Sequence, residues 1–305
     1  MTLPAAVPPT TEPAPSLVEG PAPSVVEGHD APTGDLDAKS RQLQSVLSSL
    51  ESAIVAFSGG VDSAYLAWAA TQALGRAALC VTADSPSYPD RHRRLALTIA
   101  RDFGLRHEVI RTGELERPDY RANPVNRCYY CKHELYSTLT ALASERGFGA
   151  LADGSNADDR GDYRPGRQAA REFGVRSPLE EVGLRKDEIR ELSRCAGLPT
   201  WDEPASACLS SRIPYHSEVT DAKLRMIERA EDALRALGFR VCRVRHHDGL
   251  ARVEIGRDDL PRALEPDVHD RIVRDLAALG YQHITIDPQG YRMGSLNEGV
   301  RLRPV

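Results

Sequence analysis

Two serines and two glycines stand between an apolar run and an expected helix, in a pattern suited to holding an anion. The hexad is Ser58-Gly59-Gly60-Val61-Asp62-Ser63. Glycines let the backbone approach an anion closely, while the serine hydroxyls and the first free amides of the helix donate hydrogen bonds to it. The hexad lacks the Gly-Lys-Ser/Thr ending of a Walker loop, so it predicts phosphate binding without implying γ-phosphate transfer. A tight strand–helix turn is the alternative interpretation.

Cys128 and Cys131 form a Cys-x-x-Cys pair just ahead of an expected helix, with Arg127 and Lys132 beside them. Two thiolates at this spacing can share a metal or a cluster, and the adjacent cations favour the thiolate state. A redox pair and two unremarkable thiols are the alternatives. A four-cysteine zinc site is not indicated, because the sequence contains no second such pair.

Cys208 lies among small residues and is followed by Ser211 and Arg212. An arginine at this place can hold a carboxylate or a phosphate through two parallel hydrogen bonds. Arg243 and Arg245 alternate along an expected strand, so both side chains point to one face and suit the same kind of anion. A buried structural cysteine and a solvated strand face are the competing interpretations. The remaining cysteines are assigned to structure: Cys80, Cys195 and Cys242.

Short apolar runs alternate with helical stretches in the first two thirds of the chain, which is typical of a parallel sheet with helices on both faces. We expect strands at 53–57, 77–83, 106–111 and 150–153, and helices at 40–50, 61–74, 91–103, 131–146 and 186–196. The carboxyl ends of such strands meet at one edge of the sheet, where ligands bind. The pattern predicts an α/β domain over residues 39–212.

The last third of the chain has a different pattern. A helix is expected at 220–237, capped by Thr220, and strands at 241–246 and 251–255 flank an Asp-Gly pair that tolerates positive φ in a hairpin turn. Helical stretches at 258–264 and 268–279 precede a strand at 283–287. We predict a smaller α+β domain over residues 213–305.

The first 38 residues contain eight of the 21 prolines and a direct repeat, PAPSLVEG followed by PAPSVVEG. Such a segment cannot bury enough apolar surface to order itself, so we predict a disordered leader over 1–38. Six of the 44 acidic residues and none of the 39 basic residues lie there, so the remaining chain has a net charge of +1. No apolar run approaches the length of a membrane span, and the leader does not fit a signal peptide, which predicts a cytoplasmic protein.

The hexad resembles the loop of the PP-loop ATP pyrophosphatase superfamily, whose members cleave ATP between its α- and β-phosphates. Four further segments narrow the resemblance to the LarE family: residues 126–132, 152–166, 201–215 and 243–247. These are ATP-dependent sacrificial sulfur transferases of nickel-pincer nucleotide biosynthesis. The resemblance covers about residues 40–290, and implies an α/β PP-loop domain followed by a smaller α+β domain.

The resemblance implies ATP and Mg²⁺ as cofactors. Residues matching the family's pyrophosphate-binding positions are Ser58, Gly59, Gly60, Asp62 and Ser63, and Asp62 is expected to help position the metal. Ala83 lies near the end of the next strand, where the nucleoside is expected. Further candidates for the nucleotide or the metal are Asp153, Asn156, Asp159 and Lys186, of which Lys186 can equally be a solvated lysine.

The implied substrate is pyridinium-3,5-biscarboxylic acid mononucleotide, one carboxylate of which is adenylated and then receives sulfur. Residues matching the family's substrate-contacting positions are Ser211, Arg212, Glu231, Arg243 and Arg245. In one branch of the family a cysteine matching Cys208 loses its own sulfur and becomes dehydroalanine. In another branch three cysteines hold a [4Fe–4S] cluster, and Cys128, Cys131 and Cys208 match them. Three ligands leave one iron open, which favours the cluster branch.

Three other functions remain open at this point. A PP-loop tRNA thiolase would have to neutralise many phosphates, for which a body of net charge +1 offers no general surplus. An amidating ligase would not need the cysteines, and a nucleotide or cluster sensor would bind ATP without transfer. We expect a small nucleotide as the partner rather than a nucleic acid or a membrane, and the family implies a homo-oligomer, hexamers included.

Overall fold

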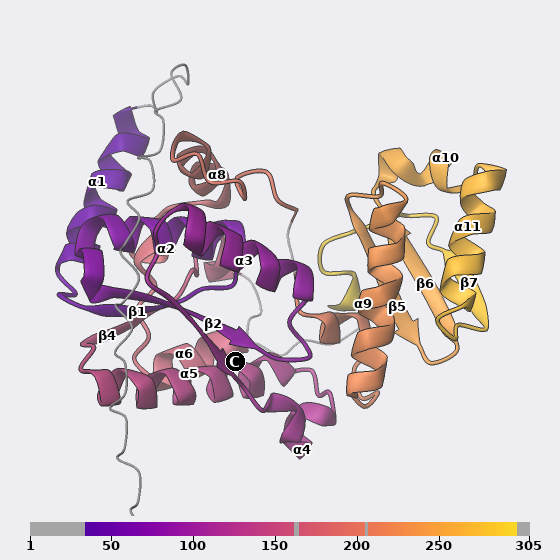
Figure 1. Ribbon diagram of the computed structural model, residues 1–305, viewed down its shortest axis with the longest axis horizontal. Helices are drawn as coiled ribbons and strands as arrows, with labels where there is room; N and C mark the ends of the chain where they lie inside the picture. Colours follow the sequence, from indigo (N-terminus) through magenta and orange to yellow (C-terminus); the bar gives the residue numbers. More distant parts are fainter. Residues whose placement is uncertain (1–33, 162–164, 205–206, 298–305) are drawn as a thin grey trace, which may run out of the picture. The chain divides into compact units, whose positions relative to one another are not determined.

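The computed structural model describes residues 34–161, 165–204 and 207–297 (Figure 1). Most of the expected leader, residues 1–33, lies outside the described residues. Residues 34–38, the end of the predicted leader, are helical rather than disordered. Helix α1 runs over Gly34–Ser48 and therefore begins earlier than expected. Leu36, Leu43 and Leu47 recur at helical spacing and are buried, so this end of the expected leader gains enough apolar contact to order itself.

The first sheet is parallel throughout, with the strand order β3-β2-β1-β4. Its strands are β1 (Ala53–Ala56), β2 (Ala78–Asp84), β3 (His107–Arg111) and β4 (Ala150–Ala152), each within two residues of the expected bounds. The helices connected to them are α2 (Val61–Leu74), α3 (Asp90–Asp102), α4 (Pro118–Arg121), α5 (Arg127–Arg146), α6 (Gly166–Glu172), α7 (Pro178–Glu181) and α8 (Lys186–Cys195). This arrangement confirms the predicted α/β fold.

The two faces of the sheet bury separate apolar clusters. Ala53 and Val55 of β1 pack with residues of α1, α2, α3 and α8. Ile54, between them, packs on the opposite face with residues of α5 and α6. Figure 1 shows α2 on one side of the sheet and α5 and α6 on the other. Because successive side chains of a strand point to opposite faces, a strand covered by helices on both faces reads as a continuous apolar run.

The second sheet has the order β5-β6-β7 and combines both pairings. Strands β5 (Cys242–His247) and β6 (Leu250–Ile255) form the expected antiparallel hairpin, with Asp248 at φ +51° in its turn. Strand β7 (His283–Ile286) pairs in parallel with β6. Helices α9 (Asp221–Ala236), α10 (Leu260–Ala263) and α11 (Pro266–Ala277) accompany this sheet, and Thr220 caps α9 as expected. These elements confirm the predicted α+β region; its boundary at residues 212 and 213 stays a prediction.

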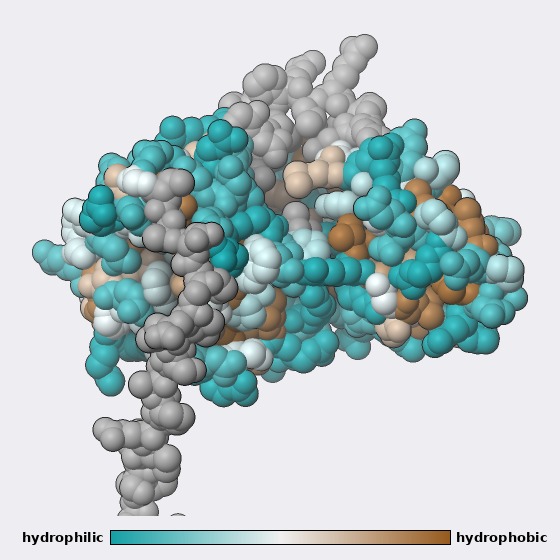
Figure 2. Space-filling view, turned by 90° about the horizontal axis from the view of Figure 1, so that it is seen from above, coloured by the Kyte–Doolittle hydropathy of each residue, from teal (hydrophilic) through white to brown (hydrophobic). Residues whose placement is uncertain are grey.

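Six large apolar side chains are exposed among the described residues. Figure 2 shows hydrophobic residues as separate areas among hydrophilic ones on the face that it presents. The exposed large apolar residues are Leu97, Val109, Trp201, Leu264, Val273 and Met293. Within the described ranges, no helix is long and apolar enough to cross a membrane.

Candidate active site

The phosphate loop joins β1 to α2, and its shape depends on Gly59. This residue has φ +63°, a backbone conformation that side chains rarely adopt. A Cβ at Gly59 would also lie 3.0 Å from the carbonyl oxygen of His92 and 3.1 Å from the Cβ of Ala96, so α3 packs directly against the loop. Gly60 is the N-cap of α2 and carries no side chain to cap it. The first amides of α2 are therefore available to an anion.

The two serines of the loop are linked to each other. Their hydroxyl oxygens lie 3.0 Å apart, and the Ser63 hydroxyl donates to the carbonyl of Gly60 at 3.1 Å while accepting from the amide of Ser58 at 3.1 Å. Gly154, just beyond β4, approaches the same point, since a Cβ there would lie 2.9 Å from the amide nitrogen of Ser63. The loop after β4 therefore closes on the amino end of α2.

Asp62 has one carboxylate oxygen paired and one without a partner. Its Oδ2 forms an ion pair with the Nζ of Lys186, the first residue of α8. Its Oδ1 is buried and has no hydrogen-bond partner among the described residues. Lys186, a candidate from the sequence, therefore contacts the phosphate loop through Asp62.

The other candidates beyond β4 form hydrogen bonds with residues of the same segment and its neighbours. Asp153 is buried and accepts hydrogen bonds from the hydroxyls of Tyr136 at 2.7 Å and Ser177 at 2.8 Å. Asp159 accepts from the amide of Asn156 at 3.1 Å. These contacts hold the segment that carries Gly154. Residues 162–164 of the same motif lie outside the described residues.

The segment after β2 connects the phosphate loop to Cys208. The hydroxyl of Tyr88 donates to the carbonyl of Ser58 at 2.8 Å. One residue earlier, the carbonyl of Ser87 accepts the amide of Leu209, also at 2.8 Å. Ala83, at the end of β2, is half-buried. A single short segment therefore contacts both the loop that suits phosphate and the residue that follows the candidate sulfur site.

The three candidate cysteines lie in two segments that face each other. Helix α5 begins at Arg127, so Cys128 and Cys131 lie within its first turns rather than ahead of it as expected. Cys208 directly precedes the short helix η4 (Leu209–Arg212). Cys128 is exposed at the start of α5, and Cys131 and Cys208 are half-buried. Burial and then Glu114 raise the pKa of Cys131, to which Cys208 and Cys128 also contribute. Arg127 donates to the carbonyl of Ser210 at 3.0 Å, and Cys131 packs against the apolar cluster that includes Leu209 and Ile213, so the two segments are in contact.

The other three cysteines stand apart from this group. Cys80 and Cys242 are buried, and burial raises their pKa to about 12 and about 11. Cys195 is exposed at the end of α8, with its Sγ 3.6 Å from Glu191. All six cysteines are free.

Arg212 is fully buried and joins the Cys208 segment to α9. It forms a two-pronged ion pair with Glu231, with distances of 2.8 Å from Nε to Oε1 and 3.2 Å from Nη2 to Oε2. Its Nη1 donates to the carbonyl of Cys208 at 3.0 Å and to the hydroxyl of Ser211 at 2.9 Å. Burial alone would raise the pKa of Glu231, but the Arg212 guanidinium overrides it, with Arg243 and Arg235 adding to the effect, and holds that pKa at about 2.

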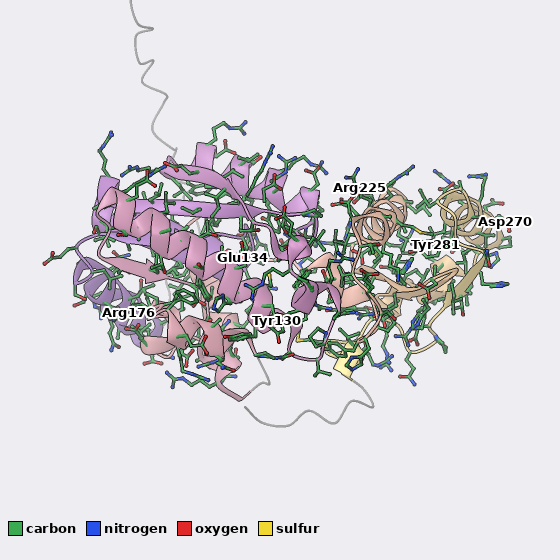
Figure 3. All side chains as sticks on the ribbon, turned by 90° about the horizontal axis from the view of Figure 1, so that it is seen from below. Tyr130, Glu134, Arg176, Arg225, Asp270 and Tyr281 are labelled. Atoms are coloured by element: carbon green, nitrogen blue, oxygen red, sulfur yellow. The ribbon has the colours of Figure 1, made fainter. Side chains whose placement is uncertain are left out.

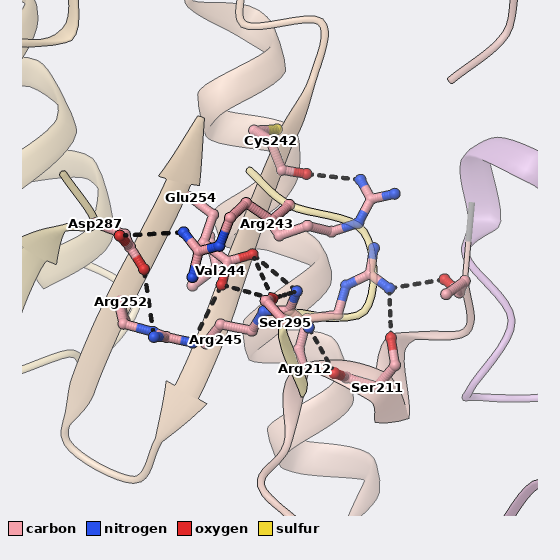
Figure 4. A network of polar contacts seen from close by, with 12 residues as sticks. Ser211, Arg212, Cys242, Arg243, Val244, Arg245, Arg252, Glu254, Asp287 and Ser295 are labelled. Atoms are coloured by element: carbon pink, nitrogen blue, oxygen red, sulfur yellow. Dashed lines mark hydrogen bonds and ion pairs between the residues drawn. The ribbon is translucent and has the colours of Figure 1, made fainter. Parts of the chain in front are cut away.

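Arg243 and Arg245 share the polar face of the β5–β6 hairpin, as their alternation predicted (Figure 4). Arg245 donates to the carbonyl of Ser211 at 2.8 Å and pairs with the fully buried Glu254 at 2.8 Å. The guanidinium of Arg243 lies 5.1 Å from the centre of the Tyr291 ring. The opposite face of the hairpin, including Val244 and Val253, enters the apolar cluster of this region. The structure thus brings the five predicted substrate residues together.

Three residues at this site were not among the sequence candidates: Tyr88, His92 and Glu254. Glu254 lies opposite Arg243 in the hairpin register, so the expected strand pairing was a usable signal for it. His92 is buried on α3, and burial followed by the charge of Arg91 lowers its pKa to about 4. Nothing in the sequence distinguishes Tyr88 or His92 from their neighbours, because their roles depend on contacts across the fold.

Comparison with known proteins supports the class that the fold and loop define, a PP-loop enzyme. No model of a protein family matches the chain. The chain is 43% identical over 262 residues to an uncharacterized protein of Synechocystis, which covers 86% of this chain and 98% of that one. It is 35% identical over 267 residues to the pyridinium-3,5-bisthiocarboxylic acid mononucleotide synthase of Lactiplantibacillus plantarum, covering 86% of this chain and 95% of that enzyme.

A third relative, an uncharacterized protein of Methanocaldococcus jannaschii, is 28% identical over 239 residues, or 78% of this chain and 90% of its own length. The identity to the synthase extends over nearly the whole of both proteins. The chain therefore belongs to the LarE family within the PP-loop ATP pyrophosphatase superfamily, and it is an enzyme.

Proposed function

We propose that this enzyme adenylates a carboxylate of pyridinium-3,5-biscarboxylic acid mononucleotide with ATP and converts it to the thiocarboxylate. The observation that carries the proposal is the 35% identity to a synthase named for the bisthiocarboxylic acid product. The contacts of residues 87 and 88 support it, because they join the phosphate loop to the Cys208 segment. One active site can therefore serve both activation and sulfur transfer.

In the first step a carboxylate oxygen attacks the α-phosphorus of ATP, and the bond to the β-phosphate breaks. The leaving pyrophosphate needs donors that do not have to rearrange as charge develops on it. We assign this role to the loop of Ser58, Gly59, Gly60, Asp62 and Ser63, with the amino end of α2 behind it. In the second step sulfur attacks the carbonyl carbon of the acyl adenylate, and AMP leaves with the electron pair of the broken bond.

The donors at the loop fit a magnesium ion. Asp62 Oδ1 is buried and without a hydrogen-bond partner in the described part of the chain, and a carboxylate oxygen is a ligand that Mg²⁺ prefers. Mg²⁺ at this place would neutralise charge on the pyrophosphate. Across the described residues, no three His, Cys, Asp or Glu side chains are placed to hold one ion. Phosphates and water would therefore supply most of its ligands.

The sulfur chemistry belongs to Cys128, Cys131 and Cys208. In a [4Fe–4S] cluster these three cysteines would each bind a different iron, and the cluster would supply an open iron for the transferable sulfur. The alternative is that Cys208 gives up its own sulfur. In both cases Arg212 and Ser211 fix Cys208, since both donate to its carbonyl.

We assign recognition of the nucleotide substrate to Ser211, Arg212, Glu231, Arg243 and Arg245. Arg212 and Arg245 are held by the buried carboxylates of Glu231 and Glu254, and Arg243 donates to the carbonyl of Cys242 at 2.7 Å. In this assignment Glu231 orients Arg212, and Arg245 supports the backbone of Ser211. Guanidiniums suit the phosphate and carboxylates of such a substrate.

Pyrophosphate release tests the proposal. With ATP and Mg²⁺, we expect pyrophosphate to appear only when the dicarboxylate mononucleotide is added, and not with tRNA. Release that depends on tRNA would overturn the proposal in favour of a tRNA thiolase, and binding of ATP without release would indicate a sensor. The matched control is Ser63→Ala, which removes a loop hydroxyl and should lower the rate without altering the cysteines.

Protein mass after turnover separates the two sulfur sources. We expect an unchanged mass at Cys208 and repeated turnover when the reconstituted enzyme is supplied with sulfide. Loss of the elements of H₂S from Cys208, with activity kept in Cys128→Ala, would overturn the cluster assignment. We further propose that the enzyme acts in the cytoplasm as a homo-oligomer as large as a hexamer; its six free cysteines suit a reducing compartment, and light scattering in solution measures its size.

A further inference from the structure

Arg127 is a buried cation for which the described residues offer no carboxylate. Its side chain is only 2% exposed. Its Nη1 donates to the carbonyl of Ser210 at 3.0 Å and to the side-chain oxygen of Asn123. Its Nε is buried and has no hydrogen-bond partner in this part of the structure. A buried charge is costly unless an anion compensates it, so Arg127 calls for an anion.

Other arginines of the protein, unlike Arg127, have a carboxylate as a partner among the described residues. Arg212 and Arg245 are buried to a similar degree, and each faces a buried carboxylate at 2.8 Å. Arg117, near the same helix, lies 3.5 Å from the carboxylate of Glu134 and 5.9 Å from the ring centre of Tyr130. Figure 3 labels Tyr130 and Glu134 on α5. In place of a carboxylate, Arg127 has the neutral oxygens of Asn123 and Ser210 and the ring of Tyr215, with a centre 6.0 Å away.

The position of Arg127 indicates what kind of anion it receives. It is the first residue of α5, a helix of 20 residues, so the positive end of the helix dipole adds to its charge. Its Nη1 contacts the carbonyl of Ser210, two residues after Cys208, and Cys128 is the next residue of the helix. Lys132 lies one turn further along the same helix, with its Nζ 5.2 Å from the ring centre of Tyr136 and no carboxylate within ion-pair distance in the described ranges.

We propose that Arg127, assisted by Lys132, forms an anion site at the amino end of α5 that binds the incoming sulfur donor, hydrosulfide in the simplest case. The site holds this anion beside Cys128 and Cys208, two of the three residues to which the sulfur chemistry is assigned. This role rests on the proposed function, because only a sulfur transferase needs such a donor. Arg127 is thereby a specificity residue for an anionic sulfur species over a neutral thiol.

Two methanethiosulfonate reagents of similar size and opposite charge test the site. The anionic sulfonatoethyl and the cationic trimethylammonioethyl reagent both react with the thiolate form of a cysteine, here Cys128 and Cys208. The ratio of the two rates therefore cancels differences in the ionisation of these thiols. The protein is the full chain, free of metal and reduced, with the exposed Cys195 replaced by Ser. We expect Arg127→Gln to lower the anionic-to-cationic rate ratio about tenfold, because loss of one nearby charge slows one reagent and speeds the other.

Three further variants make the result specific. Arg127→Lys keeps the charge and should hold the ratio within about twofold. Lys132→Gln removes the assisting charge and should lower the ratio about threefold. The matched control is Arg146→Gln at the other end of α5, where Arg146 pairs with Glu108; it changes the net charge equally and should leave the ratio unchanged.

An unchanged ratio in Arg127→Gln, or an equal fall in Arg146→Gln, would overturn the anion site. Circular dichroism shows whether Arg127→Gln folds; if it does not, Lys132→Gln decides, and an unchanged ratio there also overturns the site. The measurement uses neither ATP nor the mononucleotide. If the variants change the rate ratio as expected but the wild-type protein releases no pyrophosphate, the proposed function is contradicted and the anion site is not.

Discussion

The phosphate loop and an arginine cluster formed by Arg212 of η4 with Arg243 and Arg245 of β5 carry positive charge by different means. The loop uses backbone amides, two linked hydroxyls and a helix end. The cluster uses guanidiniums, two of which are fixed by the buried carboxylates of Glu231 and Glu254. The first device depends on backbone shape, and the second depends on balanced buried charge.

This difference determines what each region tolerates. In the loop, an added methyl group at Gly59 meets backbone atoms that cannot move aside easily. In the cluster, an isosteric change that removes charge leaves the shape intact but isolates a buried ion. Steric changes should therefore damage the loop, and neutralising changes should damage the cluster.

The largest effect is expected at Glu231. Glu231→Gln preserves the shape of the side chain but leaves Arg212 buried without its counter-ion, so we expect a loss of about 3–5 kcal/mol in the free energy of unfolding. Urea denaturation measures this. The control is Asp232→Asn on the same helix, whose half-exposed carboxylate pairs with Arg235 and should cost about 0–1 kcal/mol. Equal losses in the two variants would contradict the account of the cluster.

The acid sensitivity of the fold should show a second, comparable effect at His92. Its pKa is lowered from 6.5 to about 4, chiefly by burial and by Arg91. Between these values the unfolded chain binds the proton that the folded protein refuses, so stability falls as the pH falls, by about 3 kcal/mol in all. In His92→Gln, the free energy of unfolding should depend less on pH between about pH 7 and pH 4. Urea denaturation at a series of pH values measures this.

Glu231 can be compared with His92, because its lowered pKa makes the stability of the fold depend on pH over a different pH range. Its contribution is complete above pH 4.5 and is lost as the pH falls from there towards about 2. Glu231→Gln should therefore keep the slope between pH 7 and 4.5 that His92→Gln removes. A slope in that range that survives His92→Gln would show that another group is responsible.

A smaller effect is expected from Gly59→Ala in the loop. Its φ of +63° costs an L-residue about 1–2 kcal/mol, and the contacts with His92 and Ala96 add about 1 kcal/mol. We expect a loss of about 2–3 kcal/mol in thermal unfolding, together with weaker ATP binding. Gly104→Ala is the control, since it has the same φ but nothing within 4 Å of its added Cβ. If the two variants lose the same stability, α3 does not pack against the loop as described.

The two regions also differ in how far the sequence predicts them. The loop lies in six consecutive residues between a strand and a helix, so local pattern was enough to place it, and α2 begins and ends where expected. The face shared by Arg243 and Arg245 followed from strand alternation. The pairing of Arg212 with Glu231 and of Arg245 with Glu254 depends on packing between distant segments, which local pattern does not encode. The early start of α5 was missed because cysteine and tyrosine are weak helix formers.

The mass of the nucleotide product tests the central claim, that the loop and the cysteine segments act in one reaction. The enzyme is incubated with ATP, Mg²⁺, sulfide and the dicarboxylate mononucleotide, and product mass is followed together with AMP and pyrophosphate. The account predicts replacement of one carboxylate oxygen by sulfur, with one AMP and one pyrophosphate formed for each exchange. AMP and pyrophosphate without sulfur in the product, or sulfur incorporated without ATP, would contradict it.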